Sequence, residues 1–407
     1  MEEMILQDIC KIYDCPHTTA KDEGVGIPLV RTPNVGKGRL VLTNVHRVNS
    51  DVYKKRTLRA IPEEDDIIIA REAPVGNAAI IQKKQKVCLG QRVVLLKPNK
   101  ALVAPNFLVY YLLSNEVQHH LKIHANGAVV AHLNVADIRN LSVCLPSLCE
   151  QKKIGKSLKI IDDKIELNRR INDNLEQQAQ ALFKSWFVDF EPFKDGKFVE
   201  SELGMIPEGC RVGKAEDFYN INIGKTPPRK EQVWFSSNSS DYIWVSISDL
   251  GSCGRFVLTS SELLTHEAIK KYNIILVPKD TILLSFKLTI GRVGIAGTEL
   301  TTNEAIARFI TSDKNREYTY FLLKGYNYEK LGSTSSIATA VNSKIIKAMV
   351  VLMPDKEILK AFSSLTKPYF DQILRNEQES IRLTILRDTL LPKLMSGELK
   401  INATEVL

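Results

Sequence analysis

The segment from Ser147 to Phe187 reads SLCEQKKIGKSLKIIDDKIELNRRINDNLEQQAQALFKSWF. Its apolar residues recur in steps of four and three, which is the period of a coiled-coil seam. Two asparagines occupy seam positions between the apolar runs, and asparagine in a seam tends to select register and partner number. The residues of this stretch that we assign to a coiled-coil spacer are Ile154, Leu158, Ile161, Ile165, Asn168, Leu175 and Leu182.

Local signals mark both ends of this predicted helix. Ser147 follows a proline and precedes Glu150 by three positions, which is a capping-box pattern. Pro192 stops the helix shortly after Phe187. At a rise of about 1.5 Å per residue the rod is roughly 60 Å long. An amphipathic rod of this length requires a partner for its seam.

The same chain contains that partner. A second predicted helix begins at Asp355, a capping residue, and ends at Gly397, a natural C-cap. The offset that places Pro146 on Pro354 stays constant through the whole seam and also places Asn168 on Asn376. The spacer residues of the second helix are Ile373, Asn376, Leu383 and Leu390.

The match between the two halves extends beyond the helices. Farther upstream a slightly larger offset places Gly36 on Gly251 and Gly76 on Gly291. Two unrelated helices with heptad patterns could align by chance, but they would not also align these glycines. The chain is therefore a tandem duplication, in which each half is a globular segment followed by a long helix.

Composition is that of a globular protein with more than one domain. The chain has 407 residues, of which 44% are hydrophobic and 25% are charged. A membrane-spanning helix needs about 20 consecutive apolar residues, and no such run is present. The chain begins with Met1-Glu2-Glu3-Met4, so we expect no secretion signal. The seven cysteines lack zinc-site spacing, which favours reduced thiols in a cytoplasmic protein without a metal.

Both globular segments are mildly basic. Residues 1–146 contain 19 Lys and Arg against 14 Asp and Glu, a net charge of +5. Residues 196–354 contain 19 against 16, a net charge of +3. This balance suits a polyanionic partner such as nucleic acid but does not require one.

Short apolar runs between turn residues predict a mixed α/β fold for each globular segment. The predicted strands are Ile27–Val30, Ile67–Ala70, Ala78–Ile81, Arg92–Leu96, Leu141–Leu145, Tyr242–Ile247 and Thr281–Phe286. The predicted helices are Asn106–Leu113, Glu116–Ile123 and Tyr318–Leu323, and turns are predicted at Asn126-Gly127 and Asp249–Gly251, with a loop at Gly332–Ile337.

Basic loops follow several of these strands, where side chains can contact phosphates or base edges. The alternative is that these charges are solvated surface residues. The residues that we assign to DNA contact are His17, Thr18, Lys21, Lys37, Arg39, Arg71, Lys225, Thr226, Arg229, Lys230, Arg255, Lys287 and Arg292.

No catalytic or cofactor-binding pattern is present. Gly224-Lys225-Thr226 lacks the earlier glycine of a P-loop, and the two prolines that follow block the required helix. Asp162-Asp163-Lys164 resembles part of a nuclease centre, but its place on a heptad helix predicts exposed charge. We therefore predict a protein that is not an enzyme and needs no cofactor.

Three blocks resemble the specificity subunit of Type I restriction-modification systems. The central block runs from IIDDKIELN at 160–168 to LFKSWFVDFEP at 182–192. The others are SELGMIPEG at 201–209 and LLPKLMSGE at 390–398. The resemblance covers nearly the whole chain, although Cys210 stands where the family pattern usually has tryptophan.

The resemblance implies two target-recognition domains whose long helices pair as an antiparallel coiled coil. In that family each domain reads half of a bipartite duplex DNA site, and the helices set the spacing and dock two methyltransferase subunits, which restriction subunits then join. The implied ranges are 1–146 (first domain), 147–190 (helix), 191–354 (connector and second domain), 355–397 (helix) and 398–407 (tail).

Aromatic residues at the end of the first helix are candidates for subunit docking. Trp186 lies on the seam phase, whereas Phe187 points elsewhere. Buried aromatic residues concentrate binding energy at interfaces. The alternative is that Phe187 packs on the neighbouring globular segment.

Two other functional classes remain open from the sequence. One is a coiled-coil scaffold that joins two protein-binding domains, which salt-dependent DNA binding would contradict. The other is a nuclease or methyltransferase with an unrecognised centre, which an activity assay of the isolated chain tests.

Overall fold

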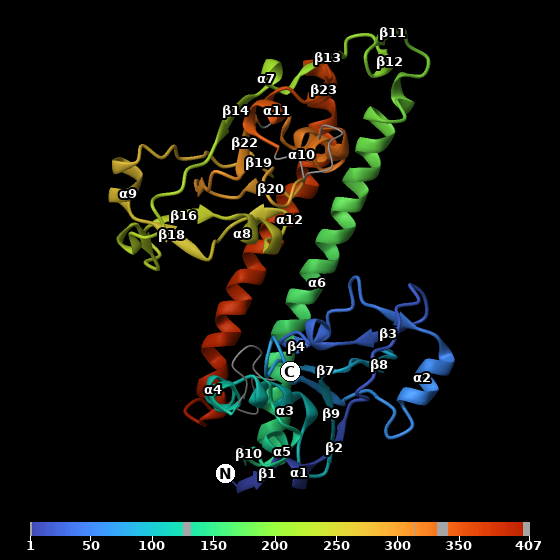
Figure 1. Ribbon diagram of the computed structural model, residues 1–407, viewed down its shortest axis with the longest axis vertical. Coiled ribbons are helices and arrows are strands. Elements are labelled where there is room, and N and C mark those ends of the chain that lie inside the picture. The colour runs from blue at the N-terminus through green and yellow to red at the C-terminus, as the bar shows by residue number, and fades with distance from the viewer. Residues whose placement is uncertain (1, 125–131, 313, 332–340, 402–407) are drawn as a thin grey trace. The chain divides into compact units, whose positions relative to one another are not determined.

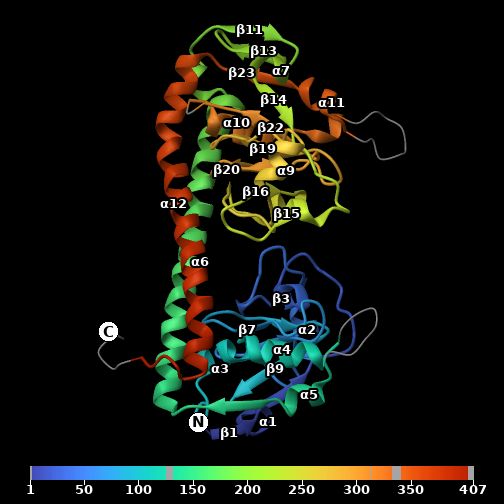
Figure 2. The ribbon, with the colours of Figure 1, turned by 90° about the vertical axis from the view of Figure 1, so that its left-hand side faces the viewer.

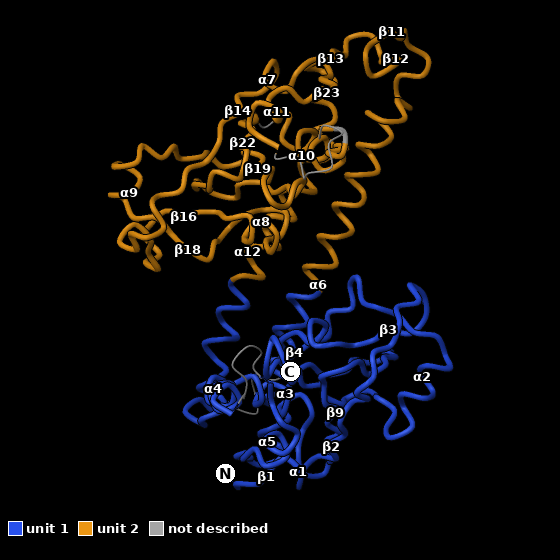
Figure 3. Tube along the Cα trace, in the orientation of Figure 1, with its two compact units in different colours: residues 1–166, 382–407 blue, residues 167–381 orange. Residues whose placement is uncertain are grey.

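The computed structural model describes residues 2–124, 132–312, 314–331 and 341–401 (Figure 1). The chain forms two compact units (Figure 3). Unit 1 comprises Met1–Glu166 and Arg382–Leu407, and unit 2 comprises Leu167–Ile381. Each unit therefore contains one globular segment and a part of each long helix. The predicted turn at 126–127 and the predicted loop at 332–337 lie outside the described residues.

The two predicted long helices are confirmed. Helix α6 spans Leu148–Phe187, and helix α12 spans Lys356–Met395, with 40 residues in each. The Ser147 hydroxyl accepts from the backbone N–H of Glu150, whose carboxylate accepts from the Ser147 N–H, so the expected capping box is present. The Asp355 carboxylate likewise accepts two N–H groups at the start of α12. None of the described helices is long and apolar enough to cross a membrane.

Within unit 2 the two helices pair in antiparallel directions (Figure 2). Asn168 Nδ2 donates to the Glu379 carboxylate at 2.8 Å. Four residues later along α6, Asn172 accepts from Asn376 Nδ2 at 2.8 Å. As the residue number increases along α6, the number of the partner residue on α12 decreases, which is the antiparallel arrangement. The asparagines that the sequence places in the seam are buried and hydrogen-bonded across it.

The predicted spacer residues also pack against the globular segments. Ile154 and Leu158 are buried in the core of unit 1, and Ile373 is buried in the core of unit 2. The remaining apolar members are half-buried, namely Ile161, Ile165, Leu175, Leu182, Leu383 and Leu390. A two-helix seam covers only part of each apolar stripe, and the adjacent globular segment covers more of it.

The expectation of exposed charge at 162–164 was wrong for Asp162. This carboxylate is only 6% exposed, and it accepts from the Tyr110 hydroxyl at 2.6 Å and from Arg387 Nη1 at 2.8 Å. Burial and the Asp162 charge raise the pKa of Tyr110 well above its ordinary value, so its hydroxyl remains a donor. The helical pattern could not reveal Asp162 as buried, since both partners come from other elements.

The globular segment of unit 1 is built on a five-stranded sheet of order β2-β9-β6-β7-β4, beside a three-stranded sheet of order β5-β3-β8. Strand β1 pairs with β10. The elements are β1 (Glu2–Ile5), α1 (Leu6–Ile9), β2 (Cys10–Asp14), β3 (Ile27–Val30), η1 (Thr32–Asn34), β4 (Gly38–Arg39), β5 (Arg47–Val48), α2 (Ser50–Arg56), β6 (Ile67–Ala70), β7 (Ala78–Ile80), β8 (Cys88–Leu89), β9 (Val93–Pro98), α3 (Pro105–Leu112), α4 (Asn115–Ile123), α5 (Val135–Arg139) and β10 (Ser142–Leu145).

The globular segment of unit 2 follows a short connector and is built on a five-stranded sheet of order β14-β22-β19-β20-β17. The elements are η2 (Glu191–Phe193), β11 (Phe198–Ser201), β12 (Gly204–Pro207), β13 (Arg211–Lys214), α7 (Ala215–Phe218), β14 (Asn220–Ile223), η3 (Gln232–Trp234), β15 (Phe235–Ser236), β16 (Tyr242–Val245), α8 (Ile247–Ser252), β17 (Phe256–Val257), β18 (Glu262–Leu264), α9 (His266–Lys271), β19 (Ile282–Ser285), β20 (Val293–Ala296), β21 (Thr301–Thr302), β22 (Ile306–Ile310), α10 (Arg316–Lys324), η4 (Tyr328–Leu331), α11 (Ser343–Lys347) and β23 (Val350–Met353).

The two five-stranded sheets have equivalent strand orders, which supports the duplication. Strands β6 and β19 begin at Ile67 and Ile282, and these two positions are related by the same offset as Gly76 and Gly291. Strand β13 pairs with β23 as β1 pairs with β10. The predicted turn at Asp249–Gly251 is wrong, because these residues belong to α8, which Ser246 caps through its side chain.

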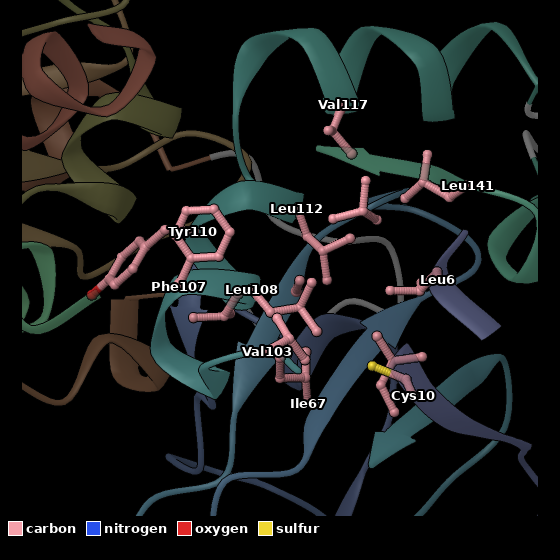
Figure 4. Packing of buried hydrophobic residues seen from close by; sticks show 14 of the residues in the cluster. Leu6, Cys10, Ile67, Val103, Phe107, Leu108, Tyr110, Leu112, Val117 and Leu141 are labelled. Atoms are coloured by element: carbon pink, nitrogen blue, oxygen red, sulfur yellow. The ribbon is translucent and has the colours of Figure 1, made fainter. Parts of the chain in front are cut away.

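The core of unit 1 lies between its five-stranded sheet and α3. Phe107 and Leu108 of α3 and Ile67 of β6 belong to one buried cluster, part of which Figure 4 shows. Leu391 and Leu394 of α12 join this cluster. The long helices are therefore part of the core of the unit. Burying side chains of this size contributes roughly 1.5–3 kcal/mol each.

The connector between the halves is packed rather than loose, as its aromatic residues predicted. The ring centroids of Phe190 and Phe198 are 6.1 Å apart. Cys210 is buried beside Ile206 and Leu352, so the cysteine found in place of the family's tryptophan fills a small apolar cluster. The boundaries proposed for the recognition domains stay a prediction, because the compact units divide both long helices.

Replacing Asn172 by leucine should destabilise unit 2 by about 1–3 kcal/mol, because a buried amide of Asn376 loses its acceptor. The double variant Asn172→Leu/Asn376→Leu should recover most of this loss, since no orphaned amide then remains in the pair. Urea unfolding of the two single variants and the double variant measures the difference. A loss in the double variant that equals the sum of the two single losses would show that the pair is not coupled.

Candidate nucleic-acid interface

Three loops meet at one end of the main sheet in unit 1. Strands β2 and β6 end beside the start of β9, with Asp14 opposite Val94 and Ala70 opposite Val93. The loops that extend these strands are residues 15–21, 71–76 and 90–92, which we call edge 1. Loops at strand ends are where binding residues concentrate. The sequence-predicted His17, Thr18, Lys21 and Arg71 all lie on edge 1.

The equivalent loops meet in unit 2. Ile223 at the end of β14 lies opposite Ala307, and Ser285 at the end of β19 lies opposite Ile306. We call residues 224–230, 286–292 and 303–305 edge 2. This edge contains the predicted residues Lys225, Thr226, Arg229, Lys230, Lys287 and Arg292. The duplication thus places most of the predicted contacts at the same position of both folds.

Arg71 is buried at the floor of edge 1 and has little capacity left for DNA. Its Nε donates to the Leu133 carbonyl at 2.9 Å, Nη1 bonds Asp14 at 3.0 Å, and Nη2 lies 2.7 Å from His132 Nε2. A pocket of about 280 Å³ opens here, with exclusively polar or charged lining residues: His17, Arg71, Glu72, Gln91, Arg92 and His132. Arg71 therefore shapes the pocket, and the other residues present hydrogen-bonding groups to it.

Arg56 fixes the first loop of edge 1, and the sequence analysis missed it. Its Nη1 donates to the Thr18 carbonyl at 2.8 Å, and its Nε donates to the Leu89 carbonyl at 2.9 Å. Gln91 Nε2 donates to the His17 carbonyl at 2.6 Å. Arg56 lies on α2, far from this loop in sequence, and no local pattern marks it as an anchor.

Arg308 has a comparable role in unit 2 and was also missed. It is 1% exposed on β22, and its guanidinium donates to the Ile223 carbonyl at 2.6 Å and the Ile275 carbonyl at 3.1 Å. Burial without an acidic partner among the described residues lowers its pKa to about 10. It remains charged at neutral pH and holds the backbone from which the 224–230 loop starts.

Two predicted cations of edge 2 are held by groups of their own unit. Lys225 Nζ donates to the Tyr272 carbonyl at 3.2 Å, and Trp244 Nε1 donates to the Lys225 carbonyl at 3.1 Å. Arg229 lies over the rings of Phe235 and Trp244 and contacts both oxygens of Glu262 at 2.8 Å. Thr226 bonds Glu304. The loop is ordered before any ligand arrives.

Arg39 and Arg255 lie away from both edges and fasten the globular segments to α6. Arg39 forms an ion pair with Asp163 in unit 1. In unit 2, Arg255 bonds Asp173 at 2.6 Å and Glu176 at 2.7 Å. Burial alone would raise the pKa of Glu176. The hydrogen bonds from Lys324 and Tyr320 and the charges of Arg255 and Lys324 outweigh this effect, so the pKa of the carboxyl is lowered from its ordinary value. The structure thus gives both arginines an internal role, whereas their assignment to DNA contact remains untested.

Four predicted lysines keep exposed charge without an ion pair to any described residue: Lys21 and Lys37 in unit 1, and Lys230 and Lys287 in unit 2. Lys37 lies in the turn before β4, which Asn77 joins by donating to the Val35 carbonyl at 3.0 Å. Arg292 differs from these lysines, since its Nη1 donates to the Ile247 carbonyl at 2.8 Å. The four lysines are the cations most accessible to a polyanion.

Phe187 is a core residue rather than an exposed docking residue. It is 6% exposed, and its ring centroid lies 4.8 Å from that of Tyr318 and 5.0 Å from that of Phe362. The structure shows the alternative, in which Phe187 packs on the globular segment, and a direct subunit contact through this ring stays a prediction. Trp186 is only partly buried beside the same core.

The described residues include no group of three or more His, Cys, Asp or Glu side chains that is arranged to hold a metal ion. The seven cysteines are free thiols. The chemistry that the two edges offer is hydrogen bonding and positive charge around ordered loops. Such an arrangement suits recognition of an extended anionic polymer.

Replacing Arg255 by methionine should lower the free energy of unfolding of unit 2 on the order of 3 kcal/mol, because Glu176 loses a partner in a largely buried site. Lys230→Ala is the matched control and should change stability by less than about 0.5 kcal/mol. Urea unfolding measures both. A stable Arg255→Met protein with weakened DNA binding would instead support the sequence-based assignment of Arg255 to DNA.

Comparison with known proteins identifies the family of this fold. A family model described as the Type I restriction modification DNA specificity domain matches residues 1–177 and 207–383. The MjaIX Type I restriction enzyme specificity subunit of Methanocaldococcus jannaschii is 29% identical over 365 residues, which cover 87% of this chain and 82% of the relative. The HindI specificity subunit of Haemophilus influenzae is 28% identical and covers 76% of this chain and 80% of the relative.

A solved structure shares the fold at low sequence identity. The crystal structure of the S subunit of the Type I restriction-modification system from M. genitalium matches with a TM-score of 0.55 and 14% identity. The match covers 97% of this chain and 95% of the other. With two matched copies of the domain and the duplicated fold described above, the chain belongs to the Type I restriction-modification DNA specificity domain family.

Proposed function

We propose that this chain is the DNA specificity subunit of a Type I restriction-modification complex, in which each globular segment binds one half of a bipartite duplex site. The observation that carries the proposal is the pair of equivalent edges. Their loops leave corresponding strands of two equivalent sheets, yet they present different side chains. Two domains of equivalent fold that carry different loop side chains are suited to recognise two different DNA sequences. The recognition domains lie within residues 1–146 and 191–354.

The chemistry of the edges fits a division between positioning and reading. Exposed lysines bind phosphates with little preference for sequence, and the polar groups of ordered loops reach base edges. Two half-sites that bind weakly then act as one tight site, because the chain links them at a high effective concentration. The subunit is non-catalytic in this proposal and works in the cytoplasm.

Replacing Lys230 or Lys287 by alanine should weaken binding to every duplex sequence, because each removes a phosphate contact. Each change should also reduce the slope of log affinity against log salt by about one. Binding at several salt concentrations measures this slope. Lys197→Ala is the control, since Lys197 is an exposed lysine of the connector. Unaltered slopes in both edge variants would remove these lysines from the DNA interface.

The partners of the chain are two methyltransferase subunits, followed by restriction subunits that join the complex. Exposed apolar residues on the long helices support a docking role. Leu167 and Ile171, one turn apart on α6, are both exposed in unit 2. Ile385 and Leu386 on α12 are exposed in unit 1. Apolar side chains that a coiled coil leaves exposed are suited to a further helix packed against it. Trp186 remains a weaker candidate.

The two long helices set the spacing between the half-sites in this proposal. Inserting one heptad after Glu166 and another after Ile381 keeps the seam in phase and lengthens both helices by about 10 Å. These positions are the last residues of their helical parts before the unit boundary. The recognised half-sites should stay the same, while the spacer between them should grow by up to about three base pairs.

Methylation mapping in cells that contain the variant with its partners measures both outcomes. Changed bases within the half-sites at an unchanged spacer length would show that the helices do not act as a ruler. A variant that carries the insertion in α6 alone is the control, because its seam is out of register. It should assemble poorly.

A further inference from the structure

The loop from 286 to 292 on edge 2 carries a leucine that packs on nothing. Leu288 is 100% exposed, and Ile290 in the same loop is 38% exposed. Lys287, one of the accessible lysines, precedes it directly. Single exposed leucines are common on protein surfaces, so exposure alone means little. Leu288 differs from such leucines because the backbone of its loop is held in a fixed conformation that is unfavourable for leucine.

Hydrogen bonds from the buried Ser285 hold the loop in one conformation. The Ser285 hydroxyl donates to the Thr289 carbonyl at 2.6 Å and accepts from the Arg292 N–H at 3.1 Å. The Gly291 N–H donates to the Ser285 carbonyl at 3.0 Å. The Thr289 N–H donates to the Lys287 carbonyl at 2.6 Å. Hydrogen bonds therefore fix the backbone of this turn both before and after Leu288.

This conformation is unfavourable for leucine. Leu288 has a φ of 60°, in the left-handed region that glycine and asparagine tolerate and branched side chains disfavour. The residue gains no packing in return, because its side chain lies entirely in solvent. A strained residue that does not serve the folded state is a reason to look for a functional contact.

We propose that Leu288 is a base-contacting residue of edge 2 that enters a groove of the DNA and packs against apolar parts of the bases. This inference rests on the proposed function. The grooves offer such groups to an apolar tip, either the thymine methyl group or the faces of a partly unstacked base step. Lys287 beside it can bind the flanking phosphate. The corresponding tip in unit 1 is Ala73-Pro74-Val75, a different shape at the same place.

Two substitutions separate a contact with DNA from a structural role. Leu288→Gly removes both the apolar side chain and the strain, and Leu288→Asn tolerates the backbone while replacing the apolar tip by a polar one. Both proteins should melt at or above the temperature of the unaltered protein. In complex with the methyltransferase subunits, both should discriminate less between the cognate duplex and its single-base-pair variants. The loss should be roughly 5- to 100-fold and confined to one or two positions of one half-site.

The control is Leu203→Asn, which alters an apolar residue, 53% exposed, in the turn between β11 and β12 and should leave discrimination unchanged. The inference is overturned if both Leu288 variants retain full discrimination at both half-sites. It is also overturned if they melt at lower temperatures, since Leu288 would then support the fold. Failure of the unaltered complex to bind duplex DNA would reject the proposed function itself, so the two failures are distinguishable.

Discussion

Buried carboxylates on the long helices hold each globular segment in place, and the remaining structure depends on these contacts. Asp162 binds Tyr110 of the globular segment and Arg387 of the opposite helix in unit 1. In unit 2, Glu176 binds Tyr320 of the globular segment, together with Arg255. A buried charge is costly without partners, so each carboxylate requires both its helix and its globular segment in position. The long helices and the globular segments are thus joined by directional bonds as well as by apolar packing.

The two edges show how one fold can present two different surfaces. The strand orders and the register at the strand ends are equivalent, so the loops start from equivalent points. The anchors of those loops are not equivalent. Arg56 reaches edge 1 from a helix, whereas Arg308 reaches the base of the 224–230 loop from a strand. The two halves share the frame, whereas the side chains that support and form the loops differ between them.

Arginine and lysine have different roles in this chain. The predicted DNA-contacting arginines bind carbonyl groups and carboxylates inside their own units, and their planar guanidinium groups suit such fixed positions. They are Arg39, Arg71, Arg229, Arg255 and Arg292. The lysines of the edges are exposed, and four of the predicted lysines make no ion pair with described residues. Lysine with a mobile stem and a compact charge can follow a phosphate backbone. Net basic charge alone could not separate these two groups of cations.

The sequence by itself determined the elements whose signals are local or periodic. The seam period, the capping residues and the stops located both long helices, and the nearly constant offset between the two halves established the duplication. Short apolar runs located the strands β3, β6, β7, β9, β10, β16 and β19, but the other strands of the described residues were not predicted, because many of them are too short for a clear pattern. Helical phase alone places the asparagines in the seam, so the sequence could locate them at the contact between the helices, where they are buried. The family resemblance was also apparent from the sequence, because the three blocks that carry it are short and local.

Only the tertiary structure decided which charged residues are free. Arg39 pairs with Asp163, and Arg255 pairs with Glu176, across separations of 124 and 79 residues that no local pattern can join. The burial of Asp162 and Phe187 was likewise invisible, because the groups that cover them come from other elements. The sequence pattern did not single out Leu288. Its exposure and its left-handed backbone depend on how Ser285 closes the loop, and that geometry exists only after the sheet has formed.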